Sequence, residues 1–314
     1  MIRAMEKPKK IIIDTDIGDD IDDAFALLAA MNAGFDIIGI TTVFENTAER
    51  ARIAKRLMKL YGNGYENVPV CVGHATPICA ETREYPHLCQ YSPEIENEDY
   101  APDGQDPDSA VDFIIDCCYK YGKELSIVAI GPFTNIARVI EKDKNALNMA
   151  GEVVIMGGAY FKQYSDWNVI CDVEAAKIMF DSVNDIKCYG ADVTHMLKIS
   201  VDDDATIVSS KKSRAVEYIA ELYGKWKAMS GGIGVLHDPL VMLCLDEREL
   251  CKYEKAPVAV IESGFGRGVT LNVSAYSKSA YNNAYEGFDM TKCHTLAREV
   301  DREKVIKRFM ECFK

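Results

Sequence analysis

The sequence predicts an α/β protein with an open, mostly parallel (mixed) sheet flanked by helices. Short apolar segments alternate with segments of helical periodicity from residue 10 to about residue 245. Such alternation is typical of a parallel sheet that is covered by helices on both faces. No internal repeat and no Gly/Ser-rich linker divides the chain. We therefore expect a single domain over residues 1–314.

Each element is indicated by its own pattern. Short apolar runs predict strands at residues 10–14, 35–43, 68–72, 125–130, 152–156 and 186–191, and a late hairpin over 258–262 and 269–273. Helical spacing predicts helices at residues 21–33, 47–61, 108–121, 133–141, 172–181, 213–229, 239–245 and 298–313. Residues 74–107 show little periodicity, and such a long connection is usually functional or disordered. A flap over a ligand and a solvated connection explain this segment equally well.

The amino-acid composition excludes some classes of binding partner. The chain has 36 basic and 49 acidic residues and a net charge of -13. This balance argues against a nucleic-acid partner, because binding to phosphates requires a basic surface. It suits a neutral small molecule or a cation. No apolar run approaches the roughly 20 residues that cross a bilayer, so we expect no membrane partner.

The cysteines favour a reducing compartment. There are 11 of them, an odd number, and none forms a Cys-x-x-Cys pair. This pattern fits free thiols better than a disulfide framework or a zinc site. We therefore expect a cytoplasmic protein.

An aspartate-rich segment follows the first predicted strand. Six of the ten residues from 14 to 23 are aspartates. Capping of the next helix would account for about two of them. Carboxylates that converge repel each other unless a cation or a proton lies between them. Because carboxylate oxygens suit Ca²⁺ or Mg²⁺ better than zinc, a metal site is favoured over capping alone.

Here the sequence resembles the inosine–uridine preferring nucleoside hydrolase family. That family has Asp-x-Asp at a strand end, then a Gly, then Asp-Asp-Ala at the start of a helix. The corresponding residues here are Asp14-Thr15-Asp16, Gly18 and Asp22-Asp23-Ala24. Two extra residues follow Gly18, so either Asp22 and Asp23 form the family's pair or Asp20 replaces one of them.

Further motifs match in the same order, so the resemblance extends over residues 11 to about 245. They are residues 39–43 with Asn46, residues 129–137 with Thr134, Met156-Gly157-Gly158, Asp166-Trp167-Asn168, residues 172–176, and His237-Asp238-Pro239. One such motif is weak, but several in the right order are specific.

The resemblance implies a Rossmann-like core and an enzyme that hydrolyses the N-glycosidic bond of a ribonucleoside to free base and ribose. A Ca²⁺-bound water would be activated by Asp16. The implied Ca²⁺ ligands are Asp16, Asp23 or Asp20, Asp238 and the backbone carbonyl of Thr134. The implied substrate contacts are Asp22 and Asn46 to the vicinal hydroxyls, Asp166 and Asn168 to the 5′ end, and His237 to the leaving base, which it would protonate. Family members assemble as homodimers or homotetramers and serve nucleoside salvage.

Two departures from the family pattern concern the sugar 5′-hydroxyl. Asp166 stands where the family has Glu, and residues 160–165 contain no counterpart of an upstream Asn. A divergent, non-catalytic nucleoside- or ribose-binding protein, or a hydrolase of modified nucleosides, therefore remains an alternative. A less favoured alternative is an Mg²⁺-dependent phosphatase of the haloacid-dehalogenase type, with Asp14 as nucleophile.

Other aromatic and histidine residues are less specific candidates for the binding site. Four aromatic residues could stack on a nucleobase, although aromatics at helical spacing are more often part of a core: Tyr223, Trp226, Tyr276 and Tyr281. The remaining histidines are interpreted as ordinary residues, with His74 near the pocket: His74, His87, His195 and His294.

Overall fold

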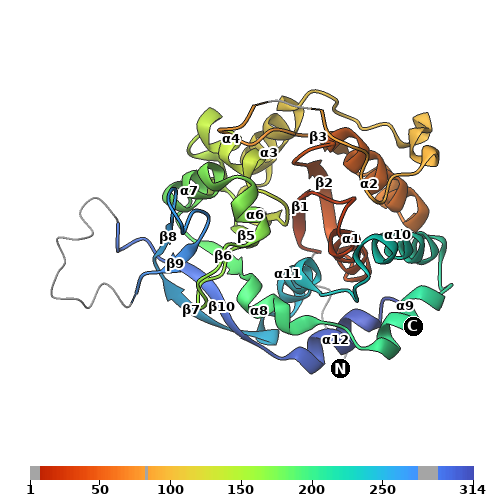
Figure 1. Cartoon of the computed structure of the whole chain (residues 1–314). Coiled ribbons are helices and arrows are strands. Elements are labelled where there is room, and N and C mark those ends of the chain that lie inside the picture. The colour runs from red at the N-terminus through yellow and green to blue at the C-terminus, as the bar shows by residue number, and fades with distance from the viewer. Residues whose placement is uncertain (1–7, 82–83, 275–288) are drawn as a thin grey trace.

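The computed structural model describes residues 8–81, 84–274 and 289–314, and within them an eight-stranded sheet lies between two layers of helices (Figure 1). The strand order is β3-β2-β1-β4-β5-β6-β10-β7. In that order the strands are Val70–Val72, Asp36–Thr42, Lys10–Thr15, Leu125–Ala129, Glu152–Met156, Ile186–Tyr189, His294–Val300 and Cys251–Ala256. All neighbours pair in parallel except β10 and β7, which are antiparallel. The predicted mixed, mostly parallel sheet is confirmed.

The helices cover both faces of the sheet (Figure 1). Ile11 and Ile13 of β1 belong to one buried apolar cluster and Ile12 to another, because successive side chains of a strand point to opposite faces. The first cluster includes side chains of α1 (Asp22–Asn32), α2 (Thr47–Tyr61), α10 (Arg214–Ser230), α11 (His237–Asp246) and α12 (Arg302–Met310). The second includes side chains of α3 (Asp108–Tyr121), α4 (Thr134–Lys142) and α7 (Val173–Ser182).

The shorter helices lie between these elements. They are α5 (Ala146–Met149), α6 (Trp167–Cys171), α8 (Ala191–Thr194) and α9 (Val201–Ser209). In the described part of the chain, no helix combines the length and apolarity that crossing a bilayer would take.

The C-terminal region differs from its prediction. A helix was expected over residues 298–313, but residues 294–300 form β10 and α12 begins only at Arg302. Strand β7 was not predicted. Both strands carry many charged residues, which join them through ion pairs such as Lys252–Glu299 at 2.6 Å. Their apolar content alone was therefore too low to indicate strands.

The late hairpin and the long connection between β3 and α3 agree better with their predictions than the C-terminal region does. Strands β8 (Val258–Val260) and β9 (Thr270–Asn272) pair antiparallel, as predicted. The connection between β3 and α3 contains two 3-10 turns, Pro93–Glu96 and Glu98–Tyr100. Its central part lies against the loop that follows β1.

The carboxyl ends of the parallel strands meet at one edge of the sheet, where ligands of such folds bind. Glycine is required at this edge, since a Cβ on Gly131 would lie 2.9 Å from both the backbone nitrogen and a carboxylate oxygen of Asp16. The turn after β4 can therefore approach the end of β1 closely.

Candidate active site

A pocket of about 740 Å³ lies at this edge of the sheet. Residues at the ends of four neighbouring strands line it: Asp16 after β1, Ile130 after β4, Met156 of β5 and Ala191 after β6. The volume is in the range of small-molecule sites. The wall also contains Asp19, Asp20, Asp22, Asp23 and Asp238.

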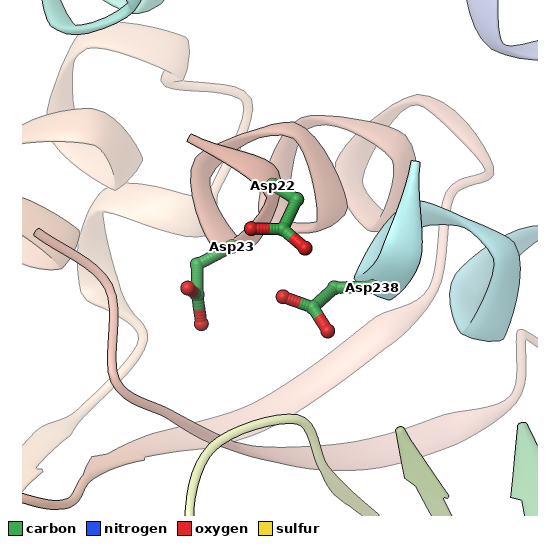
Figure 2. A group of neighbouring side chains, drawn as sticks. All are labelled: Asp22, Asp23 and Asp238. Carbon is green, nitrogen blue, oxygen red and sulfur yellow. The ribbon is translucent and has the colours of Figure 1, made fainter. Parts of the chain in front are cut away.

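Three of these aspartates converge (Figure 2). Carboxylate oxygens of Asp22, Asp23 and Asp238 lie within 4.8 Å of one another. The first two come from the start of α1 and the third from the start of α11, two helices that pack against each other. Their exposed fractions are only 6%, 3% and 3%.

Helix capping does not explain this group. The N-cap residues of α1 and α11 are Ile21 and Leu236, and neither helix has a side-chain cap hydrogen bond. Asp23 instead accepts a hydrogen bond from the Thr15 hydroxyl. The capping alternative therefore fails for these three carboxylates.

Electrostatics make the cluster a strong attractor of cations. Burial and the neighbouring carboxylates raise the pKa of Asp22, Asp23 and Asp238 well above the ordinary value. Burial also raises the pKa of Asp16 to about 6, although the Arg50 charge opposes this. Ionised buried carboxylates are costly unless they are paired or coordinate a metal, and a donor set made only of oxygens fits a hard divalent ion.

Asp20 lies apart from the convergent group. Its side chain accepts a hydrogen bond from the Ile21 backbone N–H at 2.7 Å, and the residue is exposed at the pocket rim. The geometry thus favours alignment of Asp22 and Asp23, rather than Asp20, with the family's pair.

Asp14 is buried beneath the pocket and does not line it. Its carboxylate accepts hydrogen bonds from Thr41 at 2.5 Å and Asn135 at 2.7 Å, and burial raises its pKa to about 7. These contacts join β1, β2 and α4. A nucleophilic role, as in the phosphatase alternative, does not fit this position.

The two extra residues after Gly18 are held from two sides, which no local sequence pattern indicated. The buried Arg50 guanidinium donates to Asp19 at 3.0 Å and to the backbone carbonyls of Asp16 and Ile17. From the long connection, Gln90 donates through its side chain to the Asp20 carbonyl at 2.7 Å. The long connection is therefore anchored to the acidic loop at this point.

His237 lies on the pocket wall at the start of α11. Its Nδ1 is 2.6 Å from the Thr194 hydroxyl. Burial, reinforced by the nearby His195, lowers its pKa to about 4. The imidazole is accordingly neutral near pH 7.

Asp166 and Asn168 line another part of the wall. Asp166 is the N-cap of α6 and accepts from the Val169 backbone N–H at 3.4 Å, while burial raises its pKa to about 6. Asn168 donates to the carbonyls of Ile130 at 2.7 Å and Met156 at 3.2 Å. It therefore joins the ends of β4 and β5.

Two expected site residues lie outside the pocket wall. Thr134 is fully buried at the start of α4, outside the pocket wall, and its hydroxyl donates to Asp172 at 2.6 Å. Ile130, four residues earlier, lines the pocket instead. Asn46 also lies outside the wall, because its amide donates to the Pro86 carbonyl of the long connection.

The aromatic residues that were expected to stack on a base differ in their positions. Trp226 lines the pocket, whereas Tyr223 is buried in the core and donates to Asp204 at 2.5 Å. Tyr276 and Tyr281 lie outside the described residues. His74 is not on the wall and lies 3.3 Å from Asp108.

Several residues of the pocket wall were not expected there. His195 and Tyr164 line the pocket and contact each other. Trp167, Ile170 and Met229 also line the pocket. Trp167 and Met229 are exposed by 65% and 63% despite their apolar character. The only sequence signal was their proximity to the Asp166-Trp167-Asn168 motif and to the end of a long helix.

Comparison with known proteins agrees with this geometry. The family model of the inosine-uridine preferring nucleoside hydrolases matches residues 11–307. Uridine nucleosidase 1 of Arabidopsis thaliana is 30% identical over 313 residues, which cover 96% of this chain and 92% of the relative. The inosine-uridine preferring nucleoside hydrolase of Leishmania major is 29% identical and covers 82% of this chain and 85% of its own.

Solved structures give the same result. A plant nucleoside hydrolase superposes with a TM-score of 0.80 at 28% identity, covering 98% of this chain and 99% of its own. A purine-preferring ribonucleoside hydrolase from Gardnerella vaginalis has a TM-score of 0.77 at 26% identity, covering 97% and 98%.

The sheet, the strand-end pocket and the acidic cluster define a metal-dependent hydrolase of ribonucleosides. The chain belongs to the inosine-uridine preferring nucleoside hydrolase family. It is therefore an enzyme, and the phosphatase alternative is removed.

Proposed function

We propose that this enzyme hydrolyses the N-glycosidic bond of ribonucleosides with the help of Ca²⁺ and Asp16. The observation that carries the proposal is the buried, non-capping group of Asp22, Asp23 and Asp238 in a pocket of small-molecule size. Its oxygens suit a hard cation, and a hard cation suits the vicinal hydroxyls of a ribose.

The ion would be held by Asp16, Asp23 and Asp238, with the Ile130 carbonyl in place of the expected Thr134 carbonyl. Ile130 lines the pocket, and its carbonyl oxygen already accepts from Asn168 with one of two lone pairs. Asp22, beside this group, would accept hydrogen bonds from the ribose hydroxyls. When bound, Ca²⁺ would anchor the diol and lower the pKa of a water.

The protein's own groups then supply the remaining chemistry. Asp16 accepts a proton from the attacking water, and the nearby carboxylates stabilise the positive charge that develops on the sugar. Asp166 and Asn168 hold the 5′ end of the sugar, and His237 contacts the leaving base. General-base assistance of this kind typically contributes about 10²–10⁴ in rate.

Uridine is the first substrate to test, since relatives near 30% identity are named uridine nucleosidases. Inosine is the second, since another relative is named for inosine and uridine. The half-buried Trp226 and the exposed Trp167 offer flat apolar surfaces for either kind of base.

The test is release of reducing sugar from uridine, cytidine, inosine, guanosine and adenosine, each with Ca²⁺ or with excess EGTA. We expect release from at least one nucleoside and its loss in EGTA. Calcium-dependent ribose binding without release from any nucleoside would favour the binding-protein alternative, while release that survives EGTA would remove the ion from the proposal.

We also propose a cytoplasmic location and a homo-oligomer. All eleven cysteines lie within the described residues and none is disulfide-bonded there, which fits a reducing compartment. Light scattering at several concentrations would measure the oligomeric state, and a monomer throughout would contradict that part.

A further inference from the structure

The pocket wall carries far more negative than positive charge. Besides its two histidines, it contains one basic side chain, Arg50, which is already paired with Asp19. The acidic residues of the wall are Asp16, Asp19, Asp20, Asp22, Asp23, Glu45, Asp166 and Asp238. A divalent ion in the proposed site would neutralise only two of these charges. The wall therefore keeps a negative potential with the ion bound, which favours a ligand that carries positive charge.

Asp20 is an acid of this wall that the proposed chemistry does not use. It lies apart from the convergent acidic group and belongs to the short insertion after Gly18. Its Oδ1 accepts from the Ile21 backbone N–H at 2.7 Å, whereas its Oδ2 has no hydrogen-bond or ion-pair partner among the described residues. One carboxylate oxygen at the pocket rim is thus available to a ligand.

The loop that carries Asp20 is joined to the helix that carries Trp226. Gln90 donates through its side chain to the Asp20 carbonyl at 2.7 Å, and its own carbonyl accepts from Lys225 at 3.4 Å. Trp226 is the next residue of α10, and its indole lines the pocket. The indole stacks on the Tyr223 ring with centroids 5.7 Å apart, which fixes its orientation. An aromatic face and a carboxylate oxygen both attract an organic cation.

Resting on the proposed function, we propose that the enzyme also hydrolyses nucleosides whose base carries a permanent positive charge, such as a pyridinium riboside, and that Asp20 recognises this charge. The C1′–N bond breaks, and its electron pair goes to the ring nitrogen, which leaves the base neutral. The hydroxyl of water bonds to C1′, and the other water proton goes to Asp16. The products are ribose and the neutral base, and solvent then takes the proton from Asp16.

Asp20 contributes to binding of such a substrate rather than to the rate of bond cleavage. The positive charge moves from the base to the sugar as the C1′–N bond breaks. The attraction between Asp20 and the base is therefore strongest in the bound substrate and disappears in the products. An interaction that is no stronger in the transition state than in the bound substrate does not raise kcat, so loss of the Asp20 charge should change KM.

The test compares 3-carbamoylpyridinium riboside, a permanent cation, with uridine, by release of the free base in the presence of Ca²⁺. We expect the unaltered enzyme to cleave both. Raising the salt concentration from about 0.1 M to about 1 M shortens the screening length from about 10 Å to about 3 Å. This change should raise KM for the cation about threefold or more and KM for uridine less than about twofold.

Asp20→Asn keeps an acceptor for the Ile21 N–H and removes the charge. We expect KM for the cation to rise about three- to tenfold, with kcat for the cation and both constants for uridine changed less than about twofold. Asp202→Asn is the matched control, because Asp202 is an exposed acid of α9 outside the pocket wall. It should leave both substrates unchanged.

Release of base from uridine but not from the cation would overturn this proposal. So would an equal change in KM for the two substrates in Asp20→Asn, or no change for either. Failure of the unaltered enzyme to release base from any nucleoside, charged or neutral, would instead refute the proposed function.

Discussion

Nη2 of the buried Arg50 lies 3.0 Å from the Asp19 carboxylate, which fixes one positive charge beside a loop of aspartates. The same guanidinium donates to the Phe44 carbonyl at 2.7 Å and the Ile17 carbonyl at 3.2 Å. Phe44 itself has a positive φ of 69°, a conformation that a bulky residue adopts only when its surroundings hold it there. The start of α2 and the acidic loop are thus joined through one side chain.

Arg50→Met should therefore destabilise the protein by about 2–4 kcal/mol, because buried carbonyls lose charged donors. Thermal and urea unfolding would measure this. Lys59→Met, on the same helix, removes a half-buried side chain whose ammonium lies 3.8 Å from Asp99 and 5.8 Å from the centre of the Tyr100 ring. This change should alter stability by less than about 0.5 kcal/mol. Similar small effects of both changes would show that Arg50 does not support the loop.

Removal of one carboxylate from the cluster should weaken Ca²⁺ binding strongly. We expect Asp238→Asn to reduce affinity by about 10²-fold or more, since a unit charge about 4 Å from an ion contributes roughly 4 kcal/mol near a protein surface. Calorimetric titration with Ca²⁺ would measure this. Asp246→Asn, at the other end of α11 and 3.5 Å from Arg308, should bind Ca²⁺ normally. Equal affinities in the two variants would contradict the metal site.

Stabilisation by Ca²⁺ should increase with pH. The pKa of Asp16 is raised to about 6 and those of Asp22, Asp23 and Asp238 are raised further, so the metal-free folded protein binds more protons than the unfolded chain above about pH 4. These groups make the metal-free fold less stable as pH rises through that window. Ca²⁺ displaces these protons when it binds, so the stabilisation of the fold by Ca²⁺ increases as pH rises.

Melting temperatures with Ca²⁺ and with EGTA at pH 5 and pH 7.5 would test this pH dependence. The difference at pH 7.5 should correspond to about 2.7 kcal/mol at a hundredfold excess over Kd and should be smaller at pH 5. His237 and His294, whose pKa values are lowered to about 4, act in the opposite direction, but the comparison at each pH removes their common contribution. A shift independent of pH would be incompatible with ligation by these carboxylates.

Asp166, which stands where the family has the longer Glu, should still recognise the 5′-hydroxyl of the sugar. Asp166→Asn keeps the helix cap, since Asn also caps well, but removes the charge. We expect KM for uridine to rise about tenfold or more, the value of a hydrogen bond to a charged group, while KM for 5′-deoxyuridine stays nearly constant. Asp172→Asn is the control, because Asp172 caps α7 and lies outside the pocket wall. Equal changes in KM for uridine and 5′-deoxyuridine would exclude a contact between Asp166 and the 5′-hydroxyl.

Local patterns were sufficient for much of the fold and of the site. The parallel strands, most flanking helices and the β8–β9 hairpin follow from periodicity that each segment carries by itself. The aspartates after β1 were found because several acids next to a buried strand are costly unless a cation or a proton lies between them. The His237-Asp238 pair was found through the resemblance to the family's motif. Strands β7 and β10 were missed, since their stability comes from cross-strand ion pairs and from neighbours distant in sequence.

The sequence by itself determined that carboxylates gather at the end of the first strand of a parallel sheet. Only the tertiary structure decided that Asp22, Asp23 and Asp238 converge while Asp20 stays at the rim, that Ile130 rather than Thr134 reaches the pocket, and that His195 meets Tyr164. The reason is physical: a motif specifies residue types and spacing, but the direction of each side chain depends on the strand order and on how α1, α8 and α11 pack.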